Sequence, residues 1–285
     1  MSVRSVKAVH PALRDDIADL RTRRPLPGPQ LDRIGPFLFL NHHGPQVYPP
    51  NNGGLPFGPH PHRGFETVTF VLAGDLAHRD SAGHESIIGP GGVQWMTAGR
   101  GIIHAEVSPD DFKRKGGPLE ILQLWVNLPA RLKLAPPRYT GLQVDQMPAV
   151  QVDSGHVQVN LISGVFDGHT GPIETLTGVM MSTVAMKGPA QVRFDGLSGR
   201  AVFLYVVRGT VNVGETTVVP ERLVELSDGD SVQIASREDA TLLFGHADPL
   251  DEPVVAQGPF VMNTHAEIEQ AVRDYQAGKF NASVG

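Results

Sequence analysis

The sequence predicts an all-β fold of the sandwich or barrel type, duplicated within one chain. Its 285 residues include 32 glycines and 24 prolines, and turn formers at this density are typical of many short strands. Short runs rich in Val, Ile, Leu, Phe and Thr recur between the turns, as expected for such a fold. These predicted strands are Thr67–Leu72, Gly92–Met96, Glu120–Asn127, Val157–Ile162, Val179–Met186, Ala201–Val207, Thr210–Val213, Ser231–Ile234 and Thr241–Phe244.

The duplication is indicated by a weak internal repeat. Val71–Leu76 resembles Val206–Val211 at an offset of 135 residues, and Gly92–Gln94 resembles Ser231–Gln233 at an offset of 139. A near-constant offset is expected for two copies of one β-domain. With the proline cluster between Leu128 and Pro148, it predicts an N-terminal domain over 1–135 and a C-terminal domain over 136–285.

A helix is predicted at about 264–277. Thr264 and Glu267 have the spacing of a capping box, and apolar residues follow at helical spacing from Ile268 to Tyr275. Gly278 is placed to end the helix. We expect this helix to dock on one of the two β-domains.

Composition excludes several classes of function. The formal net charge is −6, without the clustered Lys and Arg that phosphate neutralisation requires. The absence of cysteine excludes disulfides, thiolate metal sites and cysteine nucleophiles. No run approaches the roughly 18 apolar residues of a membrane span. We therefore expect a cytoplasmic monomer with no direct nucleic-acid or membrane partner.

Histidine is the most informative residue type. Seven of the twelve histidines lie between His42 and His104. Two pairs have i, i+2 spacing: His60 with His62, and His104 with Glu106. Alternate residues of a strand point to one face, so neighbouring strands would bring all four side chains together.

Three imidazoles and one carboxylate suit Fe(II), Mn(II), Ni(II), Cu(II) or Zn(II), and leave positions open for water, substrate or dioxygen. A single His-x-His pair is usually incidental, so the second pair carries the prediction of a metal site. Glu66 leaves an alternative open. Strict alternation places it on the same face as His62, either as the fourth ligand in place of Glu106 or behind the metal.

The histidine pairs lie within long motifs that continue into the second half of the chain. They read His60-Pro61-His62-Arg63-Gly64-Phe65-Glu66-Thr67-Val68, His78-Arg79-Asp80-Ser81, Gln94-Trp95-Met96-Thr97-Ala98-Gly99-Arg100-Gly101-Ile102-Ile103-His104-Ala105-Glu106, Leu122-Gln123-Leu124-Trp125-Val126-Asn127-Leu128 and Gly258-Pro259-Phe260-Val261-Met262-Asn263-Thr264. Together they resemble the pirin family of the cupin superfamily, and the resemblance runs from about Arg24 to Phe280.

The resemblance implies two cupin (jelly-roll-type) β-barrel domains facing each other, with a C-terminal helix. It also implies one divalent metal per chain, Fe(II) in most members, held by His60, His62, His104 and Glu106, with Glu66 behind them. The repeat offsets map these ligands to Asp195, Leu197, Leu243 and Gly245. We therefore expect the C-terminal domain to hold no metal.

Pirin-like proteins resemble flavonol dioxygenases, which implies that the chain cleaves quercetin with O2 and releases carbon monoxide. In that reaction the metal binds the deprotonated 3-hydroxyl group, and Glu106 is placed to accept the proton. Strand parity would put Val68 and Phe70 on the wall of an aromatic pocket. Two alternatives stay open: a non-enzymatic, redox-sensing iron protein that modulates a transcription regulator or metabolic enzyme, and a cupin that acts on another small metabolite.

Overall fold

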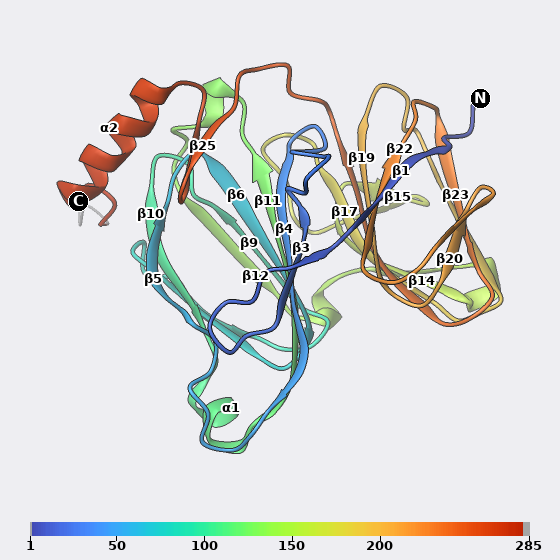
Figure 1. Ribbon diagram of the computed structural model, residues 1–285, viewed down its shortest axis with the longest axis horizontal. Coiled ribbons are helices and arrows are strands. Elements are labelled where there is room, and N and C mark those ends of the chain that lie inside the picture. The colour runs from blue at the N-terminus through green and yellow to red at the C-terminus, as the bar shows by residue number, and fades with distance from the viewer. Residues whose placement is uncertain (1, 282–285) are drawn as a thin grey trace. The chain divides into compact units, whose positions relative to one another are not determined.

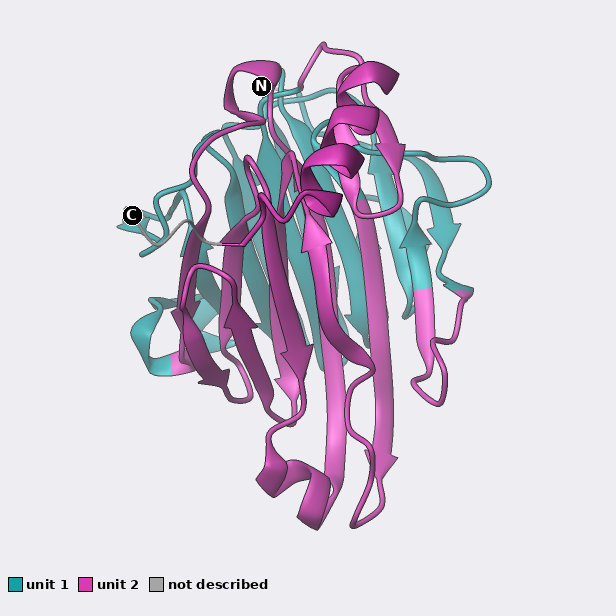
Figure 2. Cartoon of the chain, turned by 90° about the vertical axis from the view of Figure 1, so that its left-hand side faces the viewer, with its two compact units in different colours: residues 1–13, 24–38, 145–249 teal, residues 14–23, 39–144, 250–285 magenta. Residues whose placement is uncertain are grey.

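The computed structural model describes residues 2–281, and strands dominate it (Figure 1). The chain divides into two compact units, each made of three segments (Figure 2). Unit 1 combines residues 1–13, 24–38 and 145–249, and unit 2 combines residues 14–23, 39–144 and 250–285. Every strand predicted above is present, and each begins or ends one to three residues from its predicted bounds.

The units differ from the expected domains 1–135 and 136–285 because both chain ends leave their own half of the sequence. Near the N-terminus, β1 (Val6–Pro11) pairs with β22 (Arg222–Leu226) in unit 1. Near the C-terminus, β25 (Val255–Gln257), β26 (Phe260–Met262) and α2 (His265–Gln276) belong to unit 2. The C-terminal helix therefore belongs to the unit that carries the histidine pairs.

Unit 2 is built around two antiparallel sheets. The four-stranded sheet has the order β5 (Phe57–His62), β10 (Ile102–Val107), β7 (Leu76–Asp80) and β8 (Glu85–Ile88). The seven-stranded sheet has the order β12 (Arg138–Leu142), β9 (Val93–Thr97), β6 (Phe65–Ala73), β11 (Gly117–Asn127), β4 (Phe37–Tyr48), β3 (Thr22–Leu26) and β2 (Leu13–Arg14). Strands β2, β3 and β4 cross the boundary between the units.

Unit 1 repeats this plan. Its seven-stranded sheet has the order β1, β22, β19 (Ala201–Arg208), β24 (Ala240–Ala247), β17 (Met180–Met186), β14 (Val157–Ser163) and β13 (Ala149–Val152). Its four-stranded sheet has the order β18 (Ala190–Asp195), β23 (Ser231–Ser236), β20 (Val211–Val213) and β21 (Thr216–Val218). Outside the four-stranded and seven-stranded sheets of both units, the described part of the chain forms six further short elements. These are α1 (Asp110–Lys115), η1 (Ala130–Leu132), η2 (Val144–Gln146), η3 (Asp153–Gly155), β15 (Val165–Phe166) and β16 (His169–Thr170).

The strand orders support one of the two predicted repeat offsets and contradict the other. Gly74 and Gly209 both follow a central strand, β6 or β19, and both have a positive φ, of 80° and 72°, so the offset of 135 joins equivalent positions. The offset of 139 does not, because it joins β9 in the large sheet of unit 2 to β23 in the small sheet of unit 1.

The predicted C-terminal helix is confirmed. The Thr264 side chain accepts from the Glu267 amide and the Glu267 carboxylate accepts from the Thr264 amide, which is the predicted capping box. The helix buries Ile268 and Ala271 in a cluster with β26 and Phe280, beside β25 (Figure 1). Within residues 2–281, no helix has the length and apolarity needed to cross a membrane.

Candidate metal centre

Three histidines from two paired strands converge in unit 2. In the antiparallel pairing of β5 with β10, His60 lies opposite His104 and His62 lies opposite Ile102. The ring centroids lie 4.4 Å apart for His60 and His104, 4.9 Å for His60 and His62, and 5.0 Å for His62 and His104. One nitrogen from each ring lies within 4.8 Å of the other two. The prediction that the two i, i+2 pairs lie on neighbouring strands is confirmed.

The protonation state of these rings favours metal binding. Burial lowers the pKa of His62 to about 3, and the neighbouring His60 contributes in the same direction. Burial also lowers the pKa of His104 well below its usual value, assisted by His62 and His60. Both rings are therefore neutral at pH 7, and neutral imidazole is the form that donates a lone pair to a metal.

The hydrogen bonds of the rings leave the facing nitrogens available. The Nδ1 atom of His60 lies 2.7 Å from the carbonyl oxygen of Gly58, and Nδ1 of His62 lies 3.3 Å from that of Pro259. Donation to a carbonyl fixes the proton on Nδ1 and leaves Nε2 as an acceptor. Neither ring nitrogen of His104 has a hydrogen-bond partner within residues 2–281, although the residue is only 1% exposed. A buried, unsatisfied nitrogen facing two others fits a first-row divalent metal.

Glu106 is buried on the same face of β10 as His104, but three side chains hold its carboxylate. Oε1 accepts from the Thr69 hydroxyl at 2.8 Å and from the amide of Gln94. Oε2 accepts from the Gln123 amide at 2.6 Å. The carboxylate is not part of the group of donor atoms that lie within 4.8 Å of one another.

Tyr139 orients one of these amides. Its hydroxyl donates to Oε1 of Gln94 at 3.2 Å, so Nε2 of the same amide faces Glu106. Burial raises the pKa of Tyr139 to about 12, and the phenol therefore keeps its proton at neutral pH. The ring stacks on His78 at a centroid distance of 4.0 Å, and His78 lies 5.5 Å from the ring of His104.

An aromatic cluster adjoins His62. The ring of Trp125 lies 5.4 Å from that of His62, 4.4 Å from Phe65 and 4.6 Å from Phe39. These side chains come from β11, β6 and β4 of the seven-stranded sheet. Together they give the centre one apolar, flat-faced side.

The expectations for Glu66, Val68 and Phe70 are wrong. Gly64, with a φ of +89°, separates β5 from β6 and breaks the alternation that was extrapolated from His62. Thr69 contacts Glu106, so the even-numbered residues of β6 lie on the opposite face of the sheet. Glu66 is bound there by the Thr97 hydroxyl at 2.6 Å, and burial raises the pKa of Glu66 to about 7.

The polar residues around Glu106 were missed in the sequence interpretation. Thr69 on β6 pairs directly with Gln94 on β9 and with Gln123 on β11. Their signal in the sequence is a polar side chain within a strongly apolar run, on the strand face opposite Val68. This pattern could not be interpreted from the sequence without knowing which face of the strand points inward.

The equivalent positions in unit 1 are apolar. The pairing of β5 with β10 corresponds to that of β18 with β23 in the strand orders. Following the registers of these pairs, His60 corresponds to Phe194, His104 to Val232 and Glu106 to Ile234. All three apolar residues belong to the core of unit 1. The equivalents drawn from the sequence offsets, Leu243 and Gly245, lie instead on β24 of the large sheet.

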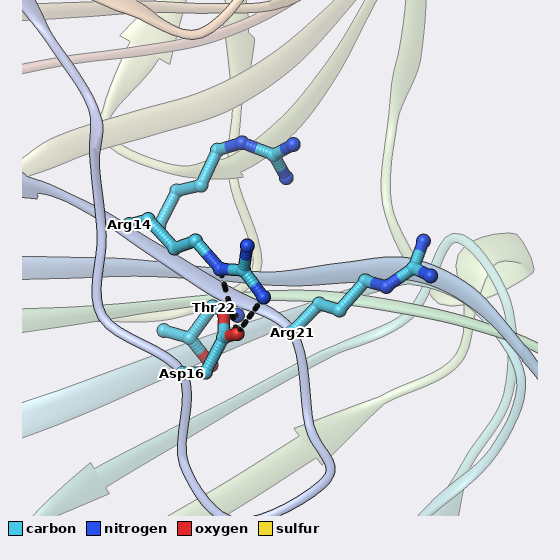
Figure 3. Close-up of a pocket in the computed structure, with 5 residues that line it drawn as sticks. Arg14, Asp16, Arg21 and Thr22 are labelled. Atoms are coloured by element: carbon cyan, nitrogen blue, oxygen red, sulfur yellow. Dashed lines mark hydrogen bonds and ion pairs between the residues drawn. The ribbon is translucent and has the colours of Figure 1, made fainter.

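A surface cavity of about 220 Å³ in unit 2 involves none of these residues. It is lined by Arg14, Asp16, Arg21, Thr22 and Arg23 (Figure 3). Asp16 lies 2.6 Å from the guanidinium of Arg14 and accepts from the backbone amide of Thr22 at 3.1 Å. The cavity has no imidazole and is unlike the histidine centre.

Comparison with known proteins matches residues 19–126 to the Pirin family and residues 181–281 to the Pirin C-terminal cupin domain. The chain belongs to the pirin family. The resemblance found in the motifs is thus confirmed. This pirin-family chain is also 41% identical to a pirin-like protein of Caulobacter vibrioides, over 98% of the chain and 100% of that relative.

Solved structures agree with the fold. A quercetin 2,3-dioxygenase from Acinetobacter baumannii matches this pirin-family chain with a TM-score of 0.90 and 30% identity, covering 99% of each chain. The bacterial pirin YhhW from Escherichia coli, solved in complex with nickel(II), matches with a TM-score of 0.69 and 21% identity, over 85% of this chain and 99% of that one. The predicted all-β fold with two cupin domains is confirmed.

Proposed function

We propose that this protein is a metal-dependent dioxygenase that cleaves flavonols such as quercetin with O2 and releases carbon monoxide. The observation that carries the proposal is the convergence of three imidazoles, with both nitrogens of buried His104 lacking a partner within residues 2–281. The likeness to a quercetin 2,3-dioxygenase over nearly the whole chain supports the substrate class.

The proposed metal is one Fe(II) per chain, and Mn, Ni, Cu or Zn would suit the same donors. The nickel(II) complex of the E. coli pirin supports a first-row divalent ion. His60 and His62 would bind through Nε2, because their Nδ1 atoms face carbonyl oxygens. Glu106 is proposed as the fourth ligand, and its carboxylate would then exchange hydrogen bonds with Thr69, Gln94 or Gln123 for a bond to the metal.

The bound metal would supply Lewis acidity and electron exchange with dioxygen. The protein residues bind and orient the substrate and move its proton. Glu106 accepts the proton of the flavonol 3-hydroxyl group, since it lies on the same buried face of β10 as His104. Gln94, held by Tyr139, limits the rotation of that carboxylate. Trp125, which is partly exposed and lies 5.4 Å from the ring of His62, offers an aromatic face to the flat ring system of the substrate.

A non-enzymatic role as an iron-dependent protein partner is the second candidate. It is favoured by the position of His60, which is only partly buried while His62 and His104 are fully enclosed. A change in the oxidation state of the metal would then alter a ligand that reaches the surface. This candidate predicts partner affinity that depends on oxidation state, and no turnover.

The test is carbon monoxide release from quercetin under air by protein reconstituted anaerobically with Fe(II). The controls are His104→Ala, which removes a ligand, and His169→Ala, which changes an exposed histidine of unit 1. We expect release by the wild type and by His169→Ala, and none by His104→Ala. Absence of carbon monoxide from protein carrying one Fe(II) per chain would refute the flavonol dioxygenase and favour the binding role.

A further inference from the structure

The segment from Pro259 to Phe280 is attached directly to the strand that carries two of the histidines. Arg63 follows His62 and forms a parallel bridge with Phe260 of β26. The Arg63 amide donates to the Pro259 carbonyl at 3.3 Å, and the Val261 amide donates to the Arg63 carbonyl at 3.0 Å. The Pro259 carbonyl also faces Nδ1 of His62. One backbone oxygen of this segment therefore contacts both a ligand and the residue after it.

The side chain of Arg63 extends this attachment to α2. It is 7% exposed and donates to the Asp274 carboxylate at 2.8 Å and to the Arg100 carbonyl at 2.6 Å. Its guanidinium carbon lies 4.6 Å from the ring centroid of Phe280. The other oxygen of Asp274 accepts from Lys279 and Gln270, both at 2.8 Å. Breaking this pair would leave a buried guanidinium without its counter-charge.

The same segment also contacts the strand of the third histidine. The Phe280 carbonyl accepts from the Ser81 hydroxyl at 2.7 Å, and that hydroxyl accepts from the amide of Ile103 at 3.1 Å. The ring of Phe280 covers Gly101, where a Cβ atom would lie 2.6 Å from ring carbons. Ile103 immediately precedes His104, so this contact fixes the backbone next to His104.

Lys133 adds a further link between β26 and the turn after β5. It is 1% exposed, and Nζ donates to the carbonyls of Gly64 and Val261, both at 2.9 Å, and to Oδ1 of Asn127 at 2.6 Å. All three ammonium protons thus have acceptors. The acceptors lie on the turn after β5, on β26 and on β11.

From these contacts we infer that the segment Pro259–Phe280 positions the metal ligands, and that Arg63, Asp274 and Phe280 are its positioning residues. The segment holds β5 through Pro259 and Arg63, and β10 through Phe280 and Ser81. Groups that fix the orientation of ligating histidines alter metal affinity and geometry without touching the metal. The inference rests on the proposed metal centre.

The experiment compares Ni(II) affinity and the Co(II) absorption spectrum of the full chain with those of four variants. Asp274→Asn removes the charge at nearly constant shape, and Phe280→Ala removes the contact at Gly101. Glu269→Gln is the matched control on α2, because its partner Arg273 is exposed and lies 3.7 Å away. We expect Asp274→Asn and Phe280→Ala to weaken Ni(II) binding about tenfold and to shift the Co(II) bands. Glu269→Gln should change neither, and Asp274→Glu should restore the wild-type spectrum.

The outcomes separate this inference from the metal centre itself. Folded Asp274→Asn and Phe280→Ala proteins with wild-type Ni(II) affinity and Co(II) bands would overturn the inference and leave the metal centre intact. A wild-type chain that binds neither ion would overturn both. If Phe280→Ala does not fold, Asp274→Asn decides alone.

Discussion

The rings of His60 and His104 lie with their centroids 4.4 Å apart, on residues directly opposite one another in the pairing of β5 with β10. This pairing explains why two short i, i+2 patterns separated by some forty residues form one site. Each strand contributes its inward face, and His62 completes the group two register positions away from the paired residues.

Removal of one ligand should abolish tight metal binding. In His62→Ala or His104→Ala, two imidazoles and the Glu106 carboxylate remain. We expect this incomplete set of donors to lose a labile divalent ion to a competing chelator. Metal content after dialysis against such a chelator checks this. The matched variant His169→Ala, at an exposed site, should keep one metal per chain. Full metal retention by either ligand variant would contradict the assignment.

Gln123→Met should weaken both the fold and the metal centre. The change keeps the volume of the side chain but removes the donor to Oε2 of Glu106, which costs about 1–3 kcal/mol for a buried acceptor. Loss of an orienting group around a ligand costs about 10–100-fold in metal affinity. Urea denaturation and Ni(II) titration measure the two effects. Gln233→Met, at an exposed position of β23, serves as the control and should leave both unchanged.

Glu66→Gln should stabilise the protein at high pH. Burial raises the pKa of Glu66 from 4.5 to about 7, against the opposing charge of Arg138. The folded protein therefore holds a proton that the unfolded chain releases, and stability is lost as the pH rises from about 4.5 to 7. The variant removes this loss, which is roughly 3 kcal/mol.

Urea denaturation of wild type and variant at pH 4.5 and pH 8 checks the sign. The advantage of Glu66→Gln should appear only at pH 8. Glu85→Gln, which changes an exposed carboxylate, should show no such difference. An equal effect of Glu66→Gln at both pH values would refute the raised pKa.

Phe244→Ala should destabilise unit 1 without loss of metal. Phe244 stacks on Phe194 at a centroid distance of 3.7 Å, and both are buried in the apolar core. Truncation of a buried Phe costs about 3–5 kcal/mol. Thermal or urea unfolding measures the loss, and Ni(II) stoichiometry at low temperature should stay at one. A loss below about 1 kcal/mol would contradict the close packing of this core.

The strands and the two i, i+2 pairs could be read from the sequence because both follow a local period of two residues. The predicted metal site required the two strands to be neighbours, and the pairing of β5 with β10 meets that condition and brings the histidines together. The parity of Glu66, Val68 and Phe70 could not be read, because Gly64 breaks the alternation between β5 and β6.

The other features that could not be predicted from the sequence depend on pairing between residues far apart in the chain. Pairing of β1 with β22 and attachment of β26 to Arg63 move the chain ends into opposite units, and no local pattern encodes either contact. The amides of Gln94 and Gln123 meet Glu106 only through the register of β6 with β9 and β11. Likewise, the true counterparts of His60 and His104, which are Phe194 and Val232, were hidden by an offset that joined unlike strands.

A crystal structure of the Fe(II)-loaded protein, with anomalous scattering recorded at the iron edge, tests the central claim most directly. We predict a single strong peak per chain about 2.1 Å from a nitrogen of each of His60, His62 and His104, with the Glu106 carboxylate moved to bind it. A peak elsewhere on the chain, or none between these three rings at full iron occupancy, would contradict the metal centre.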